Sequence, residues 1–240
     1  MSVGTAAPLI DVRGLDAFYG AAQAIFCVTF QIAAGEAVAL VGRNGAGKST
    51  TLKAIMGLIR HRAQRLAFAD TDISRMPTHV IARRGLGYVP EERRIFTDLT
   101  VGENLAVGRL PARAGRPPWT AERLYEIFPN LAEMAGRSAG RMSGGEQQML
   151  SIARTLMGNP AAVLLDEPSE GLSPLIVEQM AGAIQRMKRE GIAVLLSEQN
   201  LTFAAEIASR AILLETGSVA FDGPISELIA RQHAEDARAL

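Results

Sequence analysis

Cysteine and histidine are scarce in this chain of 240 residues, which has one cysteine, Cys27, and three histidines. A single cysteine forms no intrachain disulfide and supplies no cysteine-rich zinc site. An isolated cysteine usually behaves as a small buried hydrophobic residue, and we expect this of Cys27. The fold must therefore rest on its apolar core rather than on covalent or metal cross-links.

Charge of one sign and long apolar runs are also missing. Lys and Arg number 25, as do Asp and Glu, so the formal net charge is zero and no basic surplus favours a nucleic-acid binder. The densest apolar stretches, 161–165 and 192–196, are five residues long, against the roughly 18 of a membrane span. The first residues lack a basic start followed by an apolar stretch, so we expect no secretory signal. We expect a cytoplasmic protein that reaches a membrane only through a partner.

Strand and helix patterns alternate at both ends of the chain. Short strands with turns at Gly14, Gly20 and 34–36 fill 9–41, and a glycine-rich turn then leads into a helical pattern at 42–58. After Pro160 we predict strands at 163–165 and 192–196, helices at 175–190 and 201–207, a hairpin at 211–214 and 218–221, and a final helix. This alternation indicates an α/β fold with a mainly parallel core sheet and an N-terminal antiparallel β portion.

The middle of the chain differs from both ends. Residues 96–158 lack strand signals and include a Pro/Gly/Arg-rich stretch, 110–118, that we expect to be a surface loop. We interpret 96–158 as an inserted helical subdomain, with about 1–95 and 159–240 forming the core of one domain. Trp119 is expected to be a packing anchor in it. The arginine-rich segment 60–65 is expected to be a solvated turn.

Residues 42–49 read Gly-Arg-Asn-Gly-Ala-Gly-Lys-Ser and fit the phosphate-loop pattern G-x-x-x-x-G-K-[ST]. They follow a predicted strand, 37–41, and precede a predicted helix. Glycines allow main-chain N–H groups to face phosphate oxygens, and Lys48 reaches the β- and γ-phosphates. Ser49 would bind Mg²⁺. The pattern predicts a nucleotide site that includes Gly42, Asn44, Gly45, Ala46, Gly47 and Thr50.

Two acids follow the apolar strand 162–165. Asp166 and Glu167 fall at the carboxyl end of a buried strand, where open α/β sheets bind ligands. Asp166 would hold Mg²⁺ through water, and Glu167 would activate a water against the γ-phosphate. Helix capping is the alternative role for one of them.

Residues 142–148 read Met-Ser-Gly-Gly-Glu-Gln-Gln and open a predicted helix. Ser143 and Glu146 form a capping-box pattern, but capping does not explain the costly glycines Gly144 and Gly145. An open helix N-terminus with a serine hydroxyl is a second anion site. At this point the chain resembles the ABC ATPase family, whose signature is L-S-G-G-[EQ]-Q, with Met142 in place of the leucine.

The resemblance extends over nearly the whole chain and assigns further roles. Tyr19 falls where the family has an aromatic that stacks on adenine, although a strand aromatic that packs on the core is the alternative. Glu91 stands where a Mg²⁺-binding glutamine is usual, and Gln199 replaces the usual switch histidine near the γ-phosphate. Ser173 replaces the usual aspartate of the D-loop. These three departures call into question any mechanism that needs an imidazole at the γ-phosphate. The catalytic glutamate of the family is retained as Glu167.

Three segments, 88–96, 99–105 and 197–200, look like one branch of the family. This branch is the smaller ATPase subunit of importers for branched-chain and other hydrophobic amino acids, and urea and amide importers are near relatives. Non-transport ABC ATPases and unrelated P-loop kinases or GTPases are the alternatives. The stretch of sequence between Glu91 and Ser143 is too short to hold the coiled coil of repair ATPases. The Ser-Gly-Gly-Glu-Gln segment at 143–147 argues against a P-loop kinase or GTPase.

The resemblance implies an assembly on the cytoplasmic face of the inner membrane. Two ATPase subunits, the second a copy or a paralogue, would sandwich two ATP molecules between Lys48 of one and Ser143, Gly144, Gly145 and Glu146 of the other. Two permease subunits would contact a surface near 91–99, unless Phe96 is buried in the core instead. A periplasmic solute-binding protein would act indirectly, and no nucleic-acid partner is expected.

Overall fold

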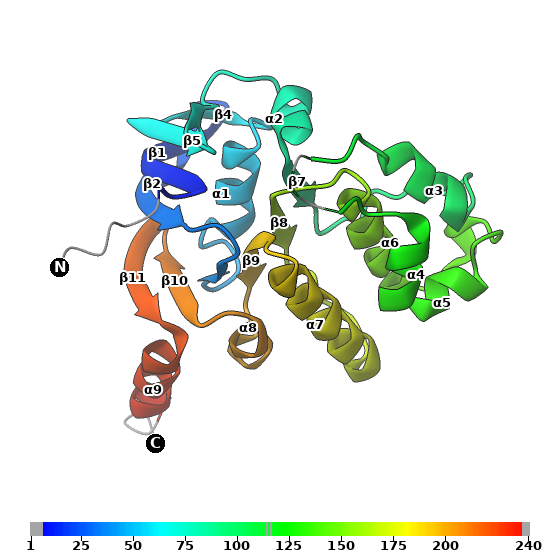
Figure 1. The fold of residues 1–240 in the computed structure, drawn as a ribbon. Coiled ribbons are helices and arrows are strands. Elements are labelled where there is room, and N and C mark those ends of the chain that lie inside the picture. The colour runs from blue at the N-terminus through cyan, green and yellow to red at the C-terminus, as the bar shows by residue number, and fades with distance from the viewer. Residues whose placement is uncertain (1–6, 114, 116, 237–240) are drawn as a thin grey trace.

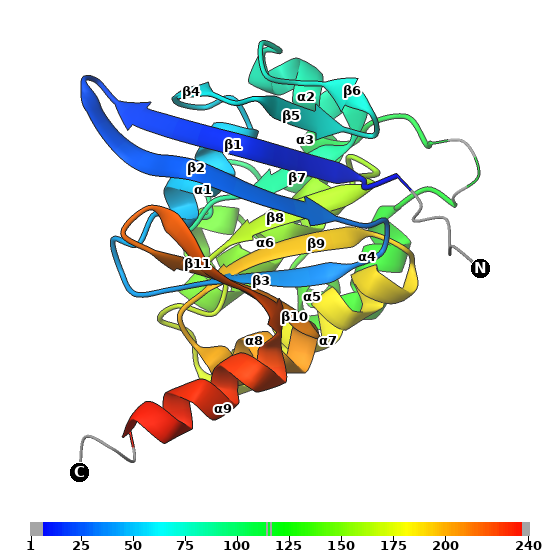
Figure 2. The same ribbon diagram turned by 90° about the vertical axis from the view of Figure 1, so that its left-hand side faces the viewer.

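The computed structural model describes residues 7–113, 115 and 117–236, which form two sheets with helices around and between them (Figures 1 and 2). The central six-stranded sheet has the order β11-β10-β3-β9-β8-β7. Its strands are β3 (Ala37–Val41), β7 (Leu86–Val89), β8 (Ala162–Asp166), β9 (Ala193–Glu198), β10 (Arg210–Glu215) and β11 (Ser218–Pro224). All neighbours pair in parallel except the β10–β11 hairpin. The predicted mainly parallel core is confirmed.

Helices on both faces explain why the central strands are buried throughout. Every residue of β3, β8 and β9 is buried, as expected for parallel strands covered on both sides. Helix α1 (Lys48–Ile55) packs between the two sheets, whereas α7 (Pro174–Arg189) and α8 (Leu201–Ile207) cover the other face (Figure 1). Helix α2 (Thr78–Arg84) lies against β7, and α9 (Ile225–Asp236) follows β11.

The second sheet is antiparallel and consists of β1 (Ile10–Tyr19), β2 (Ala22–Ile32), β4 (Arg60–Arg62), β5 (Arg65–Phe68) and β6 (Thr71–Asp72). Three expectations about this portion are wrong. Gly14 is a positive-φ irregularity inside β1 instead of a turn. Segment 60–62 is a strand that pairs with β1, where Arg60 and Arg62 cover the Phe18 ring, instead of a solvated turn. Cys27 is exposed at a positive-φ position of β2, and its own main-chain N–H donates to the Asp16 carboxylate.

A group of helices projects from one side of the core (Figure 1). It contains α3 (Val101–Gly108), α4 (Ala121–Ile127), α5 (Pro129–Glu133), a 3-10 turn at Ala139–Arg141 and α6 (Gly144–Leu156). Trp119 is buried as predicted, with the Arg123 guanidinium 4.5 Å from its ring centre. Phe96 is 47% exposed, so the alternative that it packs in the core is wrong.

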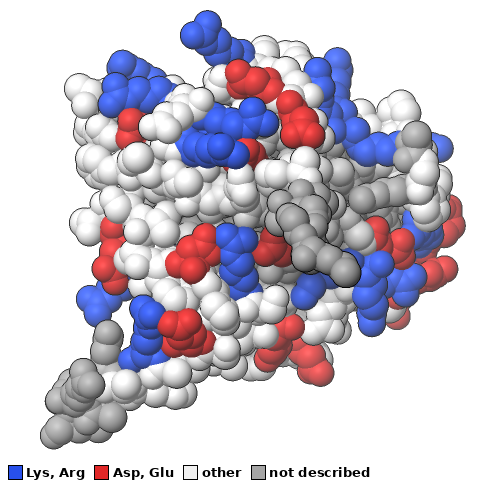
Figure 3. Space-filling model, turned by 60° about the vertical axis from the view of Figure 1, so that its left-hand side comes forward, with Lys and Arg blue, Asp and Glu red and all other residues white. Residues whose placement is uncertain are grey.

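Charges of both signs are interspersed on the face shown in Figure 3, where neither sign covers a wide area. Within the described part of the chain, no helix is both long and apolar enough to cross a membrane.

Candidate functional site

The loop 42–47 connects β3 to α1 and depends on three glycines with positive φ: Gly42, Gly45 and Gly47. A Cβ on Gly42 would lie 2.5 Å from the Leu214 carbonyl oxygen, and one on Gly47 would meet Ile25 at the same distance. Gly217 at the β10–β11 turn donates its N–H to the Ala46 carbonyl at 2.9 Å. The C-terminal hairpin therefore supports the loop from behind, and larger residues would displace it.

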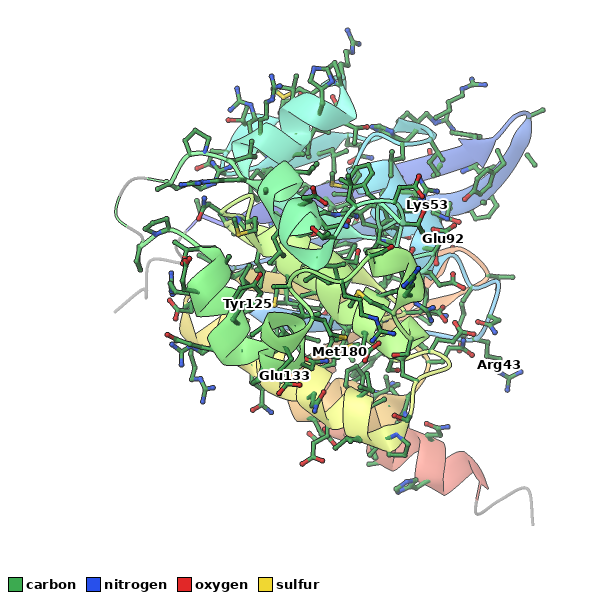
Figure 4. All side chains as sticks on the ribbon, turned by 90° about the vertical axis from the view of Figure 1, so that its right-hand side faces the viewer. Arg43, Lys53, Glu92, Tyr125, Glu133 and Met180 are labelled. Carbon is green, nitrogen blue, oxygen red and sulfur yellow. The ribbon has the colours of Figure 1, made fainter. Side chains whose placement is uncertain are left out.

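Lys48 is 3% exposed at the first position of α1. Its Nζ donates to the carbonyl oxygens of Gly42 at 2.8 Å and Arg43 at 3.3 Å. The same ammonium forms an ion pair with Glu167 Oε1 at 3.0 Å. The Arg43 side chain points away from the molecule (Figure 4). The loop thus holds one buried cation at its centre.

Tyr19 lies at the end of β1, with its hydroxyl 3.5 Å from the Thr50 hydroxyl of α1. The ring is 50% exposed, so the alternative of core packing is wrong. Ser49 and Thr50 occupy the first turn of α1 next to Lys48. An exposed ring beside the loop is available for contact with a ligand.

Asp166 is 1% exposed at the carboxyl end of β8. Its carboxylate accepts from the Ser197 hydroxyl at 2.8 Å and from the Tyr88 hydroxyl at 3.0 Å. Burial, together with the Asp166 charge and hydrogen bond, raises the pKa of Tyr88 well above its usual value, so the phenol remains a donor. Sequence reasoning missed both partners. Their signal is that Tyr88 and Ser197 are each the last residue but one of a strand next to β8.

Glu167 contacts both Lys48 at the end of the phosphate loop and Ser197 of the core strand β9. Its N–H donates to the Ser197 hydroxyl at 3.0 Å, and its φ of 43° is unusual for a non-glycine residue. Burial alone would raise the pKa of Glu167, but hydrogen bonds with Glu170, Lys48 and Gln199 lower it overall. Glu167 is therefore ionised at neutral pH. Conversely, the hydrogen bond and charge of Glu167 raise the pKa of Glu170, which sequence reasoning did not single out.

Gln199 bridges the two halves of the site. Its Nε2 donates to Asn44 Oδ1 of the loop at 2.5 Å and to Glu167 Oε2 at 3.1 Å. The preceding Glu198 is buried and accepts the N–H of Ser169 at 3.1 Å, which holds the segments after β8 and β9 together. A neutral amide thus links the loop to the carboxylate without adding charge.

Other predicted residues lie outside this hydrogen-bonded cluster. Glu91 is exposed, although its charge contributes to the raised pKa of Glu170. Ser143 and Glu146 form a complete capping box, with Ser143 N–H donating to Glu146 at 2.7 Å and Glu146 N–H to Ser143 at 3.3 Å. Among described residues, no hydrogen bond or ion pair joins 143–146 to loop 42–49.

The structure supplies a packing reason for the paired glycines. A Cβ on Gly145 would lie 2.8 Å from Ile176 of α7, and one on Gly144 would lie 2.7 Å from the Arg93 guanidinium. Both glycines therefore allow close approach by neighbouring segments. This reason stands beside the ligand role that the sequence predicts.

The residues around Lys48 fit a nucleotide phosphate and Mg²⁺ by their chemistry. A glycine cradle, an ammonium and a helix start without a side-chain cap at Gly47 are suited to an anion. Within the described residues, no group of three or more His, Cys, Asp and Glu side chains could hold a metal ion. Mg²⁺ matches that sparse donor set because it usually takes one or two carboxylates and completes its shell with phosphates and water.

Comparisons with known proteins agree with this geometry. A family model described as ABC transporter matches residues 26–170. The chain is 39% identical to the high-affinity branched-chain amino acid transport ATP-binding protein BraG of Pseudomonas aeruginosa, over 95% of this chain and 98% of that protein. It is 32% identical to the lipopolysaccharide export system ATP-binding protein LptB of Escherichia coli K12, over 94% of this chain and 95% of that protein. A nucleotide-free ATP-binding cassette from an ABC transporter has the same fold, with a TM-score of 0.79 and 23% identity over 94% of each chain.

Proposed function

The chain belongs to the ABC transporter family as an ATP-binding, ATP-hydrolysing subunit, and on this premise we propose that it drives import of branched-chain or other hydrophobic amino acids. The observation that supports this solute class is the 39% identity to BraG across nearly the whole of both chains. The 32% identity to LptB makes export the competing direction. Transport measurements separate the two.

We assign phosphate binding to loop 42–47, Lys48 and Thr50, and base stacking to Tyr19. Lys48 is held by the Gly42 and Arg43 carbonyls and by Glu167, so an incoming phosphate exchanges one anionic partner of the ammonium for another. Ser49, Asp166 and Glu91 are the proposed Mg²⁺ ligands, Asp166 through water. The ion, when bound, would neutralise phosphate charge.

Glu167 is the proposed general base for hydrolysis. The carboxylate is ionised and is held by Lys48 at Oε1 and by Gln199 at Oε2, so it can accept a proton from water once Lys48 turns to phosphate. Gln199 lies between Asn44 and Glu167 and is proposed to orient the water or the γ-phosphate as a neutral group. In this scheme, no imidazole takes part.

We further propose that a second ATPase subunit completes each site. Ser143, Gly144, Gly145 and Glu146 would contact the nucleotide held by the other subunit, because they have no bond to the loop of their own chain. We keep the proposed division into a core, about 1–95 and 159–240, and a helical insertion, about 96–158. Two permease subunits would hold the complex at the cytoplasmic face of the inner membrane, and a solute-binding protein would act through them.

The test is reconstitution with the permease subunits that co-purify with a tagged chain. ATP-dependent uptake of leucine or isoleucine into vesicles supports the proposal. Uptake of urea or an amide instead would change the solute class, whereas ATP-dependent movement of lipopolysaccharide outward would contradict import. A Lys48→Ala complex provides the inactive control.

A further inference from the structure

Residues 90–94 connect β7 to the helical segment and contain two adjacent strained residues. Arg93 has φ 63° and Arg94 has φ 46°, both in the left-handed region although neither is glycine. Two short-range bonds close this turn: Arg93 N–H to the Pro90 carbonyl at 3.1 Å and Arg94 N–H to the Glu92 carbonyl at 2.6 Å. We call it the Arg93–Arg94 turn. Strain of this kind persists only where the surroundings enforce it.

Helix α6 supplies that enforcement. Ser151 Oγ donates to the Arg93 carbonyl at 2.6 Å, and Arg154 Nη2 donates to the Arg94 carbonyl at 2.7 Å. The Arg154 guanidinium also lies 5.0 Å from the centre of the exposed Phe96 ring. The Arg93 side chain packs on Gly144 at the start of α6. The turn and the helix start are therefore mechanically linked.

The same helix carries unpaired buried polar atoms. In the described part of the chain, the buried side-chain atoms without a hydrogen-bond partner are Nε2 and Oε1 of Gln148 and Nη1 of Arg154. Gln148 is 2% exposed, and positions 148, 151 and 154 follow one another along α6 at a spacing of three. Buried amides are almost always hydrogen-bonded, and an apolar residue of the same size would avoid the cost. The strained turn and the unpaired groups therefore lie on two segments that Ser151 and Arg154 join.

We propose that Gln148 is a positioning residue for the ATPase cycle. In this conformation its amide is unpaired. In a second conformation, favoured by nucleotide, Arg93 and Arg94 leave the left-handed region and the amide bonds to main-chain groups of 90–94. This inference rests on the proposed function, since it assigns the second conformation to ATP binding.

The chemistry of the two sides matches. Unwinding the turn breaks its two internal bonds and releases N–H donors and carbonyl acceptors that must find new partners. A glutamine amide offers both a donor and an acceptor, whereas the Arg154 guanidinium offers only donors. Methionine, leucine or lysine at position 148 could not serve both needs. The glutamine amide at position 148 therefore suits both needs of the second conformation.

The turn also lies between the two proposed ATP-contacting regions. The hydrogen bond and charge of Glu167 raise the pKa of Glu170, and the charge of Glu91, two residues before Arg93, adds to this effect. On the other side, Arg93 packs on Gly144. A change at the carboxylate cluster therefore has a short route to the start of α6.

The first experiment compares Gln148→Met with Gln147→Met in the full chain without nucleotide. Gln147 is a matched control because its Nε2 donates to the Met142 carbonyl at 3.2 Å. We expect Gln148→Met to raise Tm by about 2–4 °C, since it removes an unpaired buried amide, and Gln147→Met to lower it. A lower Tm for Gln148→Met would mean that the amide is already satisfied and would overturn the proposal.

The second experiment measures amide hydrogen exchange of 90–94 with and without a non-hydrolysable ATP analogue. In the wild type we expect the analogue to change exchange in this segment by at least about threefold, and in Gln148→Met we expect that change to be lost. The kcat for ATP should fall severalfold in Gln148→Met while KM stays near the wild-type value. A purely structural residue would not combine a higher Tm with a lower kcat.

The outcomes also separate this inference from the proposed function. If the wild type neither binds the analogue nor hydrolyses ATP, the proposed function fails. If the wild type does both and exchange at 90–94 is unchanged, or if Gln148→Met retains the change, the function stands and the role of Gln148 is refuted.

Discussion

The ammonium of Lys48 lies 3.0 Å from the carboxylate of Glu167, so the residue proposed to bind phosphate and the residue proposed to activate water hold each other in this conformation. Both are buried, at 3% and 9% exposure. A buried cation that loses its partner is costly, and the pair therefore keeps both side chains in place until phosphate replaces the carboxylate.

We predict that Glu167→Gln retains ATP binding and loses turnover by about 10²–10⁴-fold, because an amide keeps the shape but cannot accept a proton. Single-turnover hydrolysis and nucleotide binding check this. Glu178→Gln, an exposed change on α7, is the matched control and should keep the wild-type rate. Near-normal hydrolysis by Glu167→Gln would remove Glu167 from the role of base.

Tyr19→Ala should weaken nucleotide affinity by about 1–3 kcal/mol, the range for stacking of an aromatic side chain on a base. The half-exposed ring makes a large loss of stability unexpected. Tyr19→Phe keeps the ring and loses only the contact with Thr50, so its affinity should stay close to that of the wild type. Titration calorimetry with a thermal melt of each variant measures both quantities. Unchanged affinity in Tyr19→Ala would contradict stacking.

Gln199→Ala should lower turnover without abolishing ATP binding, because it removes the bonds to Asn44 and Glu167. Since an amide does not titrate, the wild-type pH–rate profile should show no inflection from this position between about pH 6 and 7.5. Gln199→His should introduce one. The profiles are recorded in a complex whose second ATPase site is silenced. A Gln199→Ala rate equal to that of the wild type would exclude the residue from the reaction.

Asp11 provides a prediction about stability. It is 3% exposed and accepts hydrogen bonds from Arg13, Gln31 and Arg65. Burial alone would raise the pKa of Asp11, but these bonds lower it overall. Its stabilisation is therefore complete above the unfolded pKa of about 3.9 and lost as pH falls through the lower folded value.

We expect Asp11→Asn to cost about 1–3 kcal/mol of unfolding free energy at pH 7, and the difference from wild type to shrink below about pH 4. Urea denaturation at several pH values measures it. Asp70→Asn, whose carboxylate is 70% exposed, should change little at any pH. A pH-independent loss in Asp11→Asn would assign the effect to packing rather than to charge.

Motif spacing and periodicity were enough to predict the core elements. The strand 37–41, the helix 201–207 and the C-terminal hairpin follow from apolar runs bounded by turn residues, and the structure has them there. Both ends of α7 moved by one residue, so that Pro174 begins the helix in place of Leu175, whereas α1 ends at Ile55, three residues before the predicted end. Local sequence patterns are enough to predict a strand or helix where residues close in the sequence decide its conformation.

Features set by distant pairing could not be predicted. Segment 60–62 reads as a polar turn, yet β1 offers it a partner edge and Phe18 a surface for its arginines. Cys27 faces outward because an irregularity shifts the alternation of β2. Tyr88 and Ser197 were missed at Asp166 because their proximity depends on strand order, which the sequence does not state.

The support of the phosphate loop by the β10–β11 hairpin has a consequence for synthesis. Loop residues 42–47 leave the ribosome well before Leu214 and Gly217, which contact Gly42 and Ala46 from behind. Strand β10 also inserts beside β3, so the sheet edge next to the loop stays open until then. A nascent chain therefore carries the full phosphate-loop motif without its supporting hairpin while the residues between them are translated. We expect nucleotide to contribute its full binding energy to folding only after the β10–β11 hairpin has emerged.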